Sequence, residues 1–201
     1  MDPFELLKAD HRKVEQLFTQ LESASGKRKL QVFEQIKTEL ELHTHIEEKV
    51  FYPALEEPEE THDLALEAYE EHDVVKRLLK ELGRAKTADD EWEAKAKVLQ
   101  ENVEHHVEEE ENELFPKAET ALGAEEIESL GEQMEAEKAR KQRGSASKSS
   151  SGKKSASKSA SKSAARSTAA KRTRPSKKTG TKKASKSSGT KRSRKPATKK
   201  R

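Results

Sequence analysis

Cysteine is absent from all 201 residues of the chain. Disulfide bonds and thiolate metal sites are therefore excluded, and any transition metal must be held by histidine and carboxylate side chains. Hydrophobic residues are also few, at 30% of the sequence. A stable core therefore requires that they be concentrated on the buried faces of regular elements.

Long apolar runs are missing too. No stretch approaches the roughly 18 apolar residues that a membrane span needs. Residues 1–5, MDPFE, have neither the basic region nor the apolar run of a secretory signal. We expect an intracellular protein with no membrane partner, while its oligomeric state is left open.

Acidic residues end at Glu137. Residues 1–139 contain all 38 Asp and Glu but only 17 of the 41 Lys and Arg, a formal charge of −21, whereas residues 140–201 contain the other 24 basic residues, a charge of +24. This split predicts a folded domain at 1–138 and a basic tail at 139–201. From Gly144 onward there is no aromatic, Leu, Ile or Val residue, which predicts disorder because too little apolar surface is available to offset the entropy of ordering.

Apolar residues recur at spacings of three and four in four long segments, which predicts an all-α fold. We expect helices at about 3–23, 27–51, 60–82 and 88–115, with Pro53 closing the second and Gly83 capping the third. Short connections between them favour an up-down-up-down four-helix bundle. A short extra helix after Gly123 is expected to cover one end of the bundle.

One motif occurs twice, at His43–Pro53 and again 63 positions later at His106–Pro116. In each copy a Glu follows the His by four residues, so both lie on one helix face. His11 and His72 occupy the buried faces of the other two predicted helices. The sequence thus predicts a metal site built from His11, His43, Glu47, His72, His106 and Glu110.

Hydrogen-bonded core histidines are the alternative for any one of these residues. Four imidazoles and two carboxylates on buried faces, repeated symmetrically, favour a shared pair of metal ions, because buried polar groups need a partner. By helical position, His45, His62 and His105 are expected at the surface.

These motifs resemble those of the hemerythrin-like HHE domain over roughly residues 1–135. The resemblance implies a bundle around a non-haem di-iron centre, with His11, His43, His72 and His106 as terminal ligands and Glu47 and Glu110 as bridges. It further implies two iron ions joined by an oxo, hydroxo or water bridge, with a position open to oxygen, peroxide or nitric oxide.

The chain departs from the oxygen-carrying hemerythrins, which have a second histidine on the third helix. Here Ala68 and Lys76 stand four residues either side of His72. This departure argues against reversible oxygen carriage and favours the sensor and iron-handling members of the family.

The basic tail has the charge of a polyanion-binding segment and resembles linker-histone tails in composition. We expect it to bind DNA or another polyanion, which predicts association with the nucleoid, or with chromatin or the nucleus in a eukaryote. Contact with the acidic domain or with a membrane surface is the alternative. The residues expected to contact nucleic acid are Lys153, Lys154, Lys171, Arg172, Arg174, Lys177, Lys178, Lys182, Lys183, Lys191, Arg192, Arg194, Lys195, Lys199, Lys200 and Arg201.

The leading hypothesis is a non-enzymatic di-iron protein that binds or senses oxygen, peroxide, nitric oxide or iron and is held on DNA by its tail. One alternative is an enzyme that decomposes peroxide or oxidises ferrous iron and so protects DNA. Another is an architectural DNA-binding protein whose metal only stabilises the bundle.

Overall fold

The computed structural model describes the backbone of residues 1–155 and the side chains of residues 1–144, and all regular structure in this backbone is helical. The predicted all-α class is confirmed for this part of the chain. The helices are α1 (Pro3–Ser23), α2 (Gly26–Ile46), η1 (Glu47–Phe51), α3 (Tyr52–Leu55), α4 (Glu59–Leu82), α5 (Asp90–Glu109), η2 (Glu110–Leu114), α6 (Phe115–Ala121) and α7 (Ala124–Ser155), where η denotes a π-helix.

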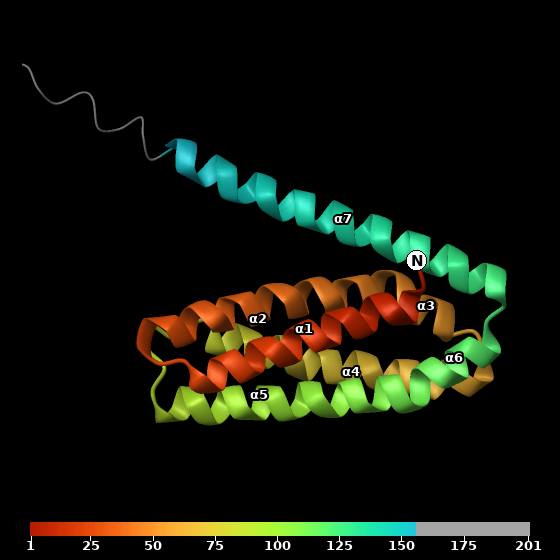
Figure 1. The fold of residues 1–201 in the computed structure, drawn as a ribbon, viewed down its shortest axis with the longest axis horizontal. Coiled ribbons are helices and arrows are strands. Elements are labelled where there is room, and N and C mark those ends of the chain that lie inside the picture. Colours follow the sequence, from red (N-terminus) through yellow and green to blue (C-terminus); the bar gives the residue numbers. More distant parts are fainter. Residues whose placement is uncertain (156–201) are drawn as a thin grey trace, which may run out of the picture. The chain divides into compact units, whose positions relative to one another are not determined.

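The long helices α1, α2, α4 and α5 run alongside one another as a helical bundle (Figure 1). Helix α1 packs along α2, and α4 packs along α5. Only two residues separate α1 from α2, and Gly26 takes a positive φ of 54° at this tight turn. Asp2 starts α1 by accepting a hydrogen bond from the backbone N–H of Phe4 at 2.8 Å, and Asp89 caps α5 in the same way.

The two motif copies differ from the prediction at their prolines. Pro53 was expected to end the second helix, but the chain stays helical through Pro53 to Leu55. In η1 the N–H of Tyr52 reaches back five residues to the carbonyl of Glu47, and η2 repeats this arrangement from Glu110. Each wide turn directly precedes the proline, and it begins at a predicted metal-binding glutamate.

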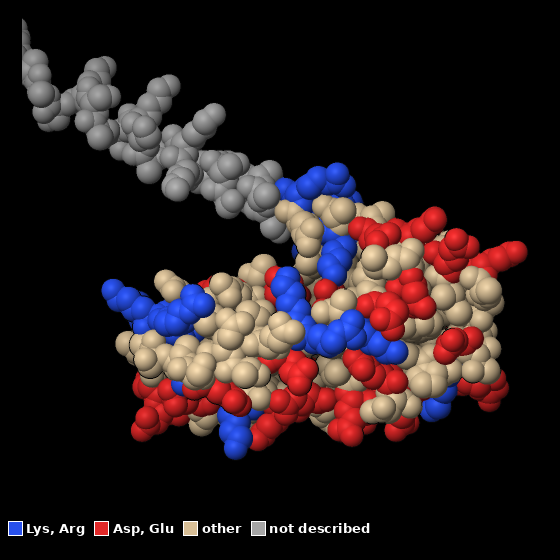
Figure 2. Space-filling model, in the orientation of Figure 1, with Lys and Arg blue, Asp and Glu red and all other residues tan. Residues whose placement is uncertain are grey.

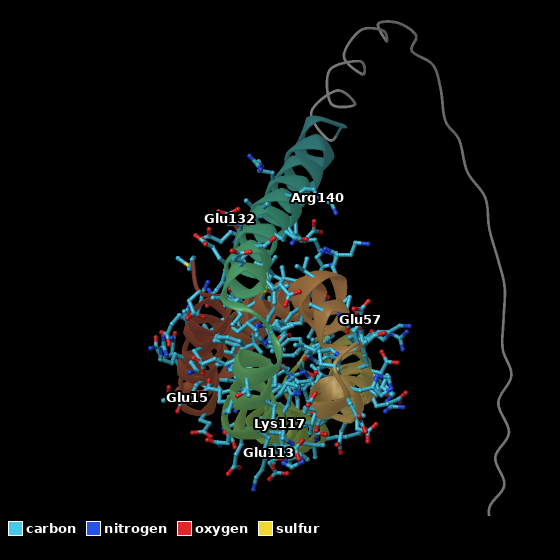
Figure 3. The ribbon with its side chains drawn as sticks, turned by 90° about the vertical axis from the view of Figure 1, so that its right-hand side faces the viewer. Glu15, Glu57, Glu113, Lys117, Glu132 and Arg140 are labelled. Atoms are coloured by element: carbon cyan, nitrogen blue, oxygen red, sulfur yellow. The ribbon has the colours of Figure 1, made fainter. Side chains whose placement is uncertain are left out.

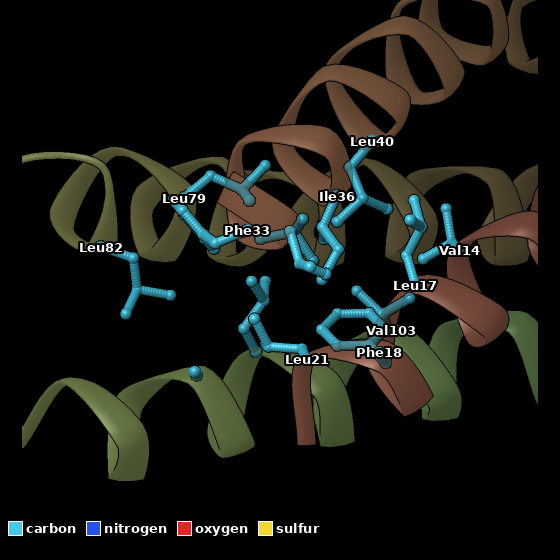
Figure 4. Close-up of a cluster of buried hydrophobic side chains, with 14 of the residues drawn as sticks. Val14, Leu17, Phe18, Leu21, Phe33, Ile36, Leu40, Leu79, Leu82 and Val103 are labelled. Atoms are coloured by element: carbon cyan, nitrogen blue, oxygen red, sulfur yellow. The ribbon is translucent and has the colours of Figure 1, made fainter. Parts of the chain in front are cut away.

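Two clusters of buried apolar side chains form the core. One centres on Phe33, whose ring lies edge-on to Trp92 with centroids 5.5 Å apart, and includes Ile36 and Leu79 (Figure 4). The other contains Phe4, Phe51 and Phe115, together with Leu130 and Met134 of α7. The charged side chains Glu15, Glu57 and Glu113 point outward from the bundle (Figure 3).

The helix after Gly123 is much longer than predicted. Helix α7 has 32 residues and continues through residues 139–155, the first part of the segment expected to be disordered. Its start is anchored by Leu130 and Met134, and Gly131 lets it approach the chain terminus, since a Cβ there would overlap the backbone oxygen of Met1. The predicted boundary at 138/139 lies within this helix, and the division into a folded domain and a basic tail stays a prediction.

Acidic side chains cover much of the face shown in Figure 2, most densely along its lower edge and right-hand end. Among the described residues, no helix combines the length and apolarity needed to cross a membrane.

Candidate metal centre

All six predicted metal-binding residues converge between the two core clusters. His11 comes from α1, His43 from α2, His72 from α4 and His106 from α5, while Glu47 and Glu110 open the two π-helices. Each is at most 6% exposed. Their ligand atoms form two overlapping groups: His11, His43, Glu47 and Glu110, and Glu47, His72 and His106.

The imidazoles are oriented by carboxylates on their outer side. His11 donates from Nδ1 to Glu111 at 2.7 Å, and His72 donates from Nδ1 to Glu48 at 3.0 Å. Because an ionised carboxylate can only accept a hydrogen bond, Nδ1 of each ring must carry the proton. In the neutral ring Nε2 is then unprotonated, and its lone pair can bind a metal.

His106 follows the same pattern, with Nδ1 2.6 Å from Glu71. Nε2 of His72 and of His106 therefore face each other at 3.1 Å, and His11 and His43 form a second pair at the same separation. In the His72–His106 pair both facing nitrogens are unprotonated when the rings are neutral, and they repel unless a proton or a cation lies between or beside them. In the other pair Nε2 of His43 can donate to Nε2 of His11, because Nδ1 of His43 has no acceptor. Each histidine pair thus has the chemistry of half a metal site.

The two glutamates span the two histidine pairs. The oxygens of Glu47 lie 3.2 Å from Nε2 of His43 and 3.4 Å from Nε2 of His72. Oε2 of Glu110 lies 3.3 Å from Nε2 of His11 and 3.6 Å from Nε2 of His106. Each carboxylate therefore contacts one imidazole from each pair, which is the arrangement that two bridging carboxylates require.

Several of these buried atoms have no hydrogen-bond partner among the described residues. They are Nδ1 of His43, both oxygens of Glu47 and Oε2 of Glu110; the short distances above do not have hydrogen-bonding geometry. Unpaired buried polar atoms are rare, and each is destabilising by about 1–3 kcal/mol. A bound cation would satisfy the three carboxylate oxygens, so the residues present fit a metal.

The electrostatics of the two carboxylates differ. Burial, followed by the negative charge of Glu110, raises the pKa of Glu47 well above its ordinary value. Burial also opposes ionisation of Glu110, but the neighbouring His106 and His11 outweigh it and lower its pKa. Burial lowers the pKa of His43 to about 4, so its ring is neutral at pH 7.

Tyr52 is a further polar residue at the site, and the sequence interpretation missed it. It is fully buried, and its hydroxyl donates to Oε1 of Glu110 at 2.9 Å while lying 3.2 Å from Nε2 of His72. Its equivalent in the other motif copy is Phe115, which stacks on His11 with ring centroids 6.1 Å apart. The two halves of the site are therefore chemically unequal.

A small cavity of about 10 Å³ lies against the four imidazoles, with Val14, Val103 and Val107 among its walls. This volume holds about one water-sized molecule. A groove of about 350 Å³ between α1 and α5 shares the same three valines and opens outward past Glu108. His11 and the three valines thus line both the cavity and the groove.

The outer carboxylates were also missed, although the motif repeat contained a signal for them. Asp10 and Glu71 precede His11 and His72, while Glu48 and Glu111 follow the predicted bridging glutamates. Applying the repeat to the neighbours of each predicted ligand would have selected all four. The other histidines lie outside the cluster: His62 and His105 are exposed, and His45 is half-buried against Glu137 at 2.7 Å.

The predicted nucleic-acid contacts lie beyond the described side chains. Lys153 and Lys154 belong to the end of α7, whose backbone alone is described there. The remaining predicted residues, from Lys171 to Arg201, lie outside the described residues.

A helical bundle that buries paired imidazoles and carboxylates defines a cation-binding protein of the histidine/carboxylate class. Residues 2–118 match the family model described as the hemerythrin HHE cation binding domain, and the chain belongs to that family.

Two known proteins are similar to the chain. The crystal structure of a hemerythrin HHE cation binding domain-containing protein from Mycobacterium kansasii matches with a TM-score of 0.62 and 27% identity, covering 70% of this chain and 86% of that one. A protein of Nostoc sp. (strain PCC 7120) named DNA nickase is 31% identical over 137 residues, which are 68% of this chain. The match spans only 39% of the length of that relative.

Proposed function

We propose that this protein holds two iron ions, one at His11 and His43 and the other at His72 and His106, with Glu47 and Glu110 bridging them. The observation that carries the proposal is the set of buried, unpaired oxygens of Glu47 and Glu110 that lie between the two histidine pairs. The ligand set of imidazoles and carboxylates without sulfur suits non-haem iron. When bound, the iron would supply Lewis acidity and one-electron redox chemistry at a position open to a small ligand.

The chain's own residues suit the binding or sensing of oxygen, peroxide, nitric oxide or iron itself. The cavity has room for about one water-sized molecule, and it shares Val14, Val103 and Val107 with the α1/α5 groove. Glu111, Glu48 and Glu71 fix the orientation of the His11, His72 and His106 rings. Tyr52 donates to one oxygen of Glu110. Such a site selects a ligand by size rather than by shape or charge.

Metal analysis tests this proposal. After anaerobic reconstitution with ferrous iron, we expect two iron ions per chain in the wild-type protein and a loss of iron in His43→Ala. His62→Ala is the matched control, because His62 is exposed and belongs to none of the histidine and carboxylate groups that could hold a metal. Fewer than one iron per chain in the wild type, or equal iron in His43→Ala, would refute the assignment.

We further propose that residues 140–201 tether the protein to DNA. The support is their 24 basic residues without an acidic one, since lysine and arginine release condensed counterions from phosphates. The likeness to a relative named DNA nickase also favours nucleic acid as the partner over the acidic bundle.

Removing residues 145–201 tests the tether. We expect the intact chain to bind duplex DNA with an affinity that falls steeply with salt. The shortened chain should retain the melting temperature of the bundle but lose DNA binding. Salt-independent binding, or binding by the shortened chain, would exclude this role for the tail.

A second candidate function is cleavage of the DNA to which the protein binds. The name of the Nostoc relative favours it, together with a metal centre and a cationic segment in one chain. Conversion of supercoiled plasmid to open circle by the iron-loaded protein would support nicking, provided that His43→Ala abolishes it. Intact supercoiled plasmid would leave binding or sensing as the function.

A further inference from the structure

The four histidines of the centre do not have equivalent outer partners. Asp10 precedes His11 as Glu71 precedes His72. By the motif repeat, Asp10 should therefore be the partner of His43, as Glu71 is the partner of His106. Glu71 accepts a hydrogen bond at 2.6 Å, whereas Oδ2 of Asp10 remains 3.8 Å from Nδ1 of His43. That distance is too long for a hydrogen bond, and Nδ1 of His43 is buried without a partner.

The carboxylate of Asp10 is instead occupied by α7. Nζ of Lys138 donates to both of its oxygens, at 2.6 and 2.5 Å. Asp10 and Lys138 are each only partly exposed, with side-chain exposures of 13% and 21%. This ion pair is thus shielded from solvent more than a typical surface pair, and it fixes Asp10 in a position away from His43.

Lysine pairing alone does not prevent contact with an imidazole. Oε1 of Glu48 lies 2.5 Å from Nζ of Lys76 and also accepts from His72 at 3.0 Å. Asp10 differs because it is one methylene shorter and because Lys138 engages both of its oxygens. The gap at His43 therefore has two physical explanations, the hold of Lys138 and the short reach of Asp10.

Metal binding at Nε2 of His43 would require Asp10 to accept a hydrogen bond from Nδ1 of that ring. A neutral imidazole that binds through Nε2 must carry its proton on Nδ1, and a buried N–H requires an acceptor. The carboxylate of Asp10 lies closest to that nitrogen among the ion-pair partners of His43, at 3.8 Å. Asp10 would have to move toward His43 and loosen its contact with Lys138.

We propose that Lys138 is a positioning residue of the metal centre, which couples metal binding at His43 to the docking of α7 through their competition for Asp10. The inference rests on the proposed metal site. Because such coupling is reciprocal, loading the site weakens the docking of α7, and docked α7 weakens metal binding by the same factor. Helix α7 leads directly into the cationic segment. Metal binding would therefore change the docking of the helix that joins the bundle to the part of the chain proposed to bind DNA.

The test compares Lys138→Met with Arg143→Met in the full-length, metal-free protein. Each variant removes one positive charge from α7, but Arg143 is exposed and is not a partner of Asp10. Anaerobic titration with Co²⁺, followed by its optical absorption, measures metal affinity. We expect Lys138→Met to bind Co²⁺ about 5-fold or more tightly than wild type, within the usual range of allosteric coupling, and Arg143→Met to match wild type.

Asp10→Asn tests whether the effect passes through this carboxylate. It should weaken Co²⁺ binding by about 10-fold or more, as loss of an outer partner commonly does. Adding Lys138→Met to Asp10→Asn should then change nothing. Amide hydrogen exchange over residues 130–144 provides a second readout: Co²⁺ should accelerate exchange in the wild type but not in Lys138→Met, where it is already fast.

Co²⁺ affinity of Lys138→Met equal to or below that of wild type would overturn the proposal and leave the short reach of Asp10 as the explanation of the gap. An increase that persists in Asp10→Asn would also overturn it. If the wild type binds neither Co²⁺ nor iron, the proposed function fails and this inference fails with it. If the wild type binds metal and the variants do not differ, only the inference fails.

Discussion

Glu47 provides a sharp test because the geometry implies that it destabilises the metal-free bundle. Its side chain is fully buried and neither oxygen has a hydrogen-bond partner. Burial and the charge of Glu110 raise its pKa well above the ordinary value, which favours the neutral acid in the metal-free protein. We therefore expect Glu47→Met, which is similar in length and apolar, to stabilise the metal-free protein while abolishing the metal site.

The magnitude follows from the unpaired atoms. Each unsatisfied buried polar group is destabilising by about 1–3 kcal/mol. Imperfect packing of the methionine side chain destabilises the variant by about 1 kcal/mol and offsets part of this gain. The net gain should be about 2 kcal/mol. For a domain of this size that corresponds to a rise in melting temperature of about 5 °C.

The assay is thermal unfolding of chelator-treated protein, with Glu48→Met as the matched control. Glu48 is the adjacent residue, but its carboxylate pairs with His72 and Lys76, so its loss should lower the melting temperature. A lower melting temperature for metal-free Glu47→Met would refute the reasoning, because it would show that the Glu47 carboxylate stabilises the bundle without metal.

Three further results are expected. Gly131→Ala should destabilise the docking of α7 by about 1–3 kcal/mol, measured by hydrogen exchange, because the new Cβ overlaps the terminal backbone. Gly144→Ala in the same helix adds a Cβ with no atom within 4 Å and should be neutral or mildly stabilising. Equal effects of the two substitutions would contradict the close approach at Gly131. Phe33→Ala should lower the free energy of unfolding by about 3–5 kcal/mol in chemical denaturation, because it empties the centre of a core cluster, and a loss below about 1 kcal/mol would contradict that packing. Hydrogen bonds from Arg140 and His45 lower the pKa of Glu137 from 4.5 to about 2, so the stabilising effect of its carboxylate is present above pH 4.5 and lost as the pH falls toward 2. The difference in melting temperature between wild type and Glu137→Gln should therefore narrow over that interval. A difference that stays constant would contradict this role of Glu137.

The metal-binding set was accessible to sequence reasoning because it depends on helical periodicity. The spacing of four between His43 and Glu47 fixes a shared face, and the repeat supplies the second half of the site. What periodicity cannot supply is a departure from the α-helix. The π-turns at Glu47 and Glu110 carry the chain past each proline, whereas the helices were predicted to end at residues 51 and 115.

The outer partners depend on contacts between helices rather than along them. Glu111 only follows a predicted ligand in the sequence, yet it contacts His11 across the bundle at 2.7 Å. Lys138 was beyond prediction because α7 was expected to be short, and its packing depends on Gly131 and Met134 meeting the bundle. Propensity alone does not show where such a helix docks.

The central claim is that the buried histidines and glutamates hold a pair of iron ions open to a small ligand. The most direct measurement is the optical spectrum of the purified protein under anaerobic, aerobic and peroxide-treated conditions, recorded together with its iron content. The account predicts two iron ions per chain and a spectrum that changes with oxidant in the wild type but not in His43→Ala. A protein that contains less than one iron per chain, or whose spectrum is unchanged by oxygen and peroxide, would contradict it.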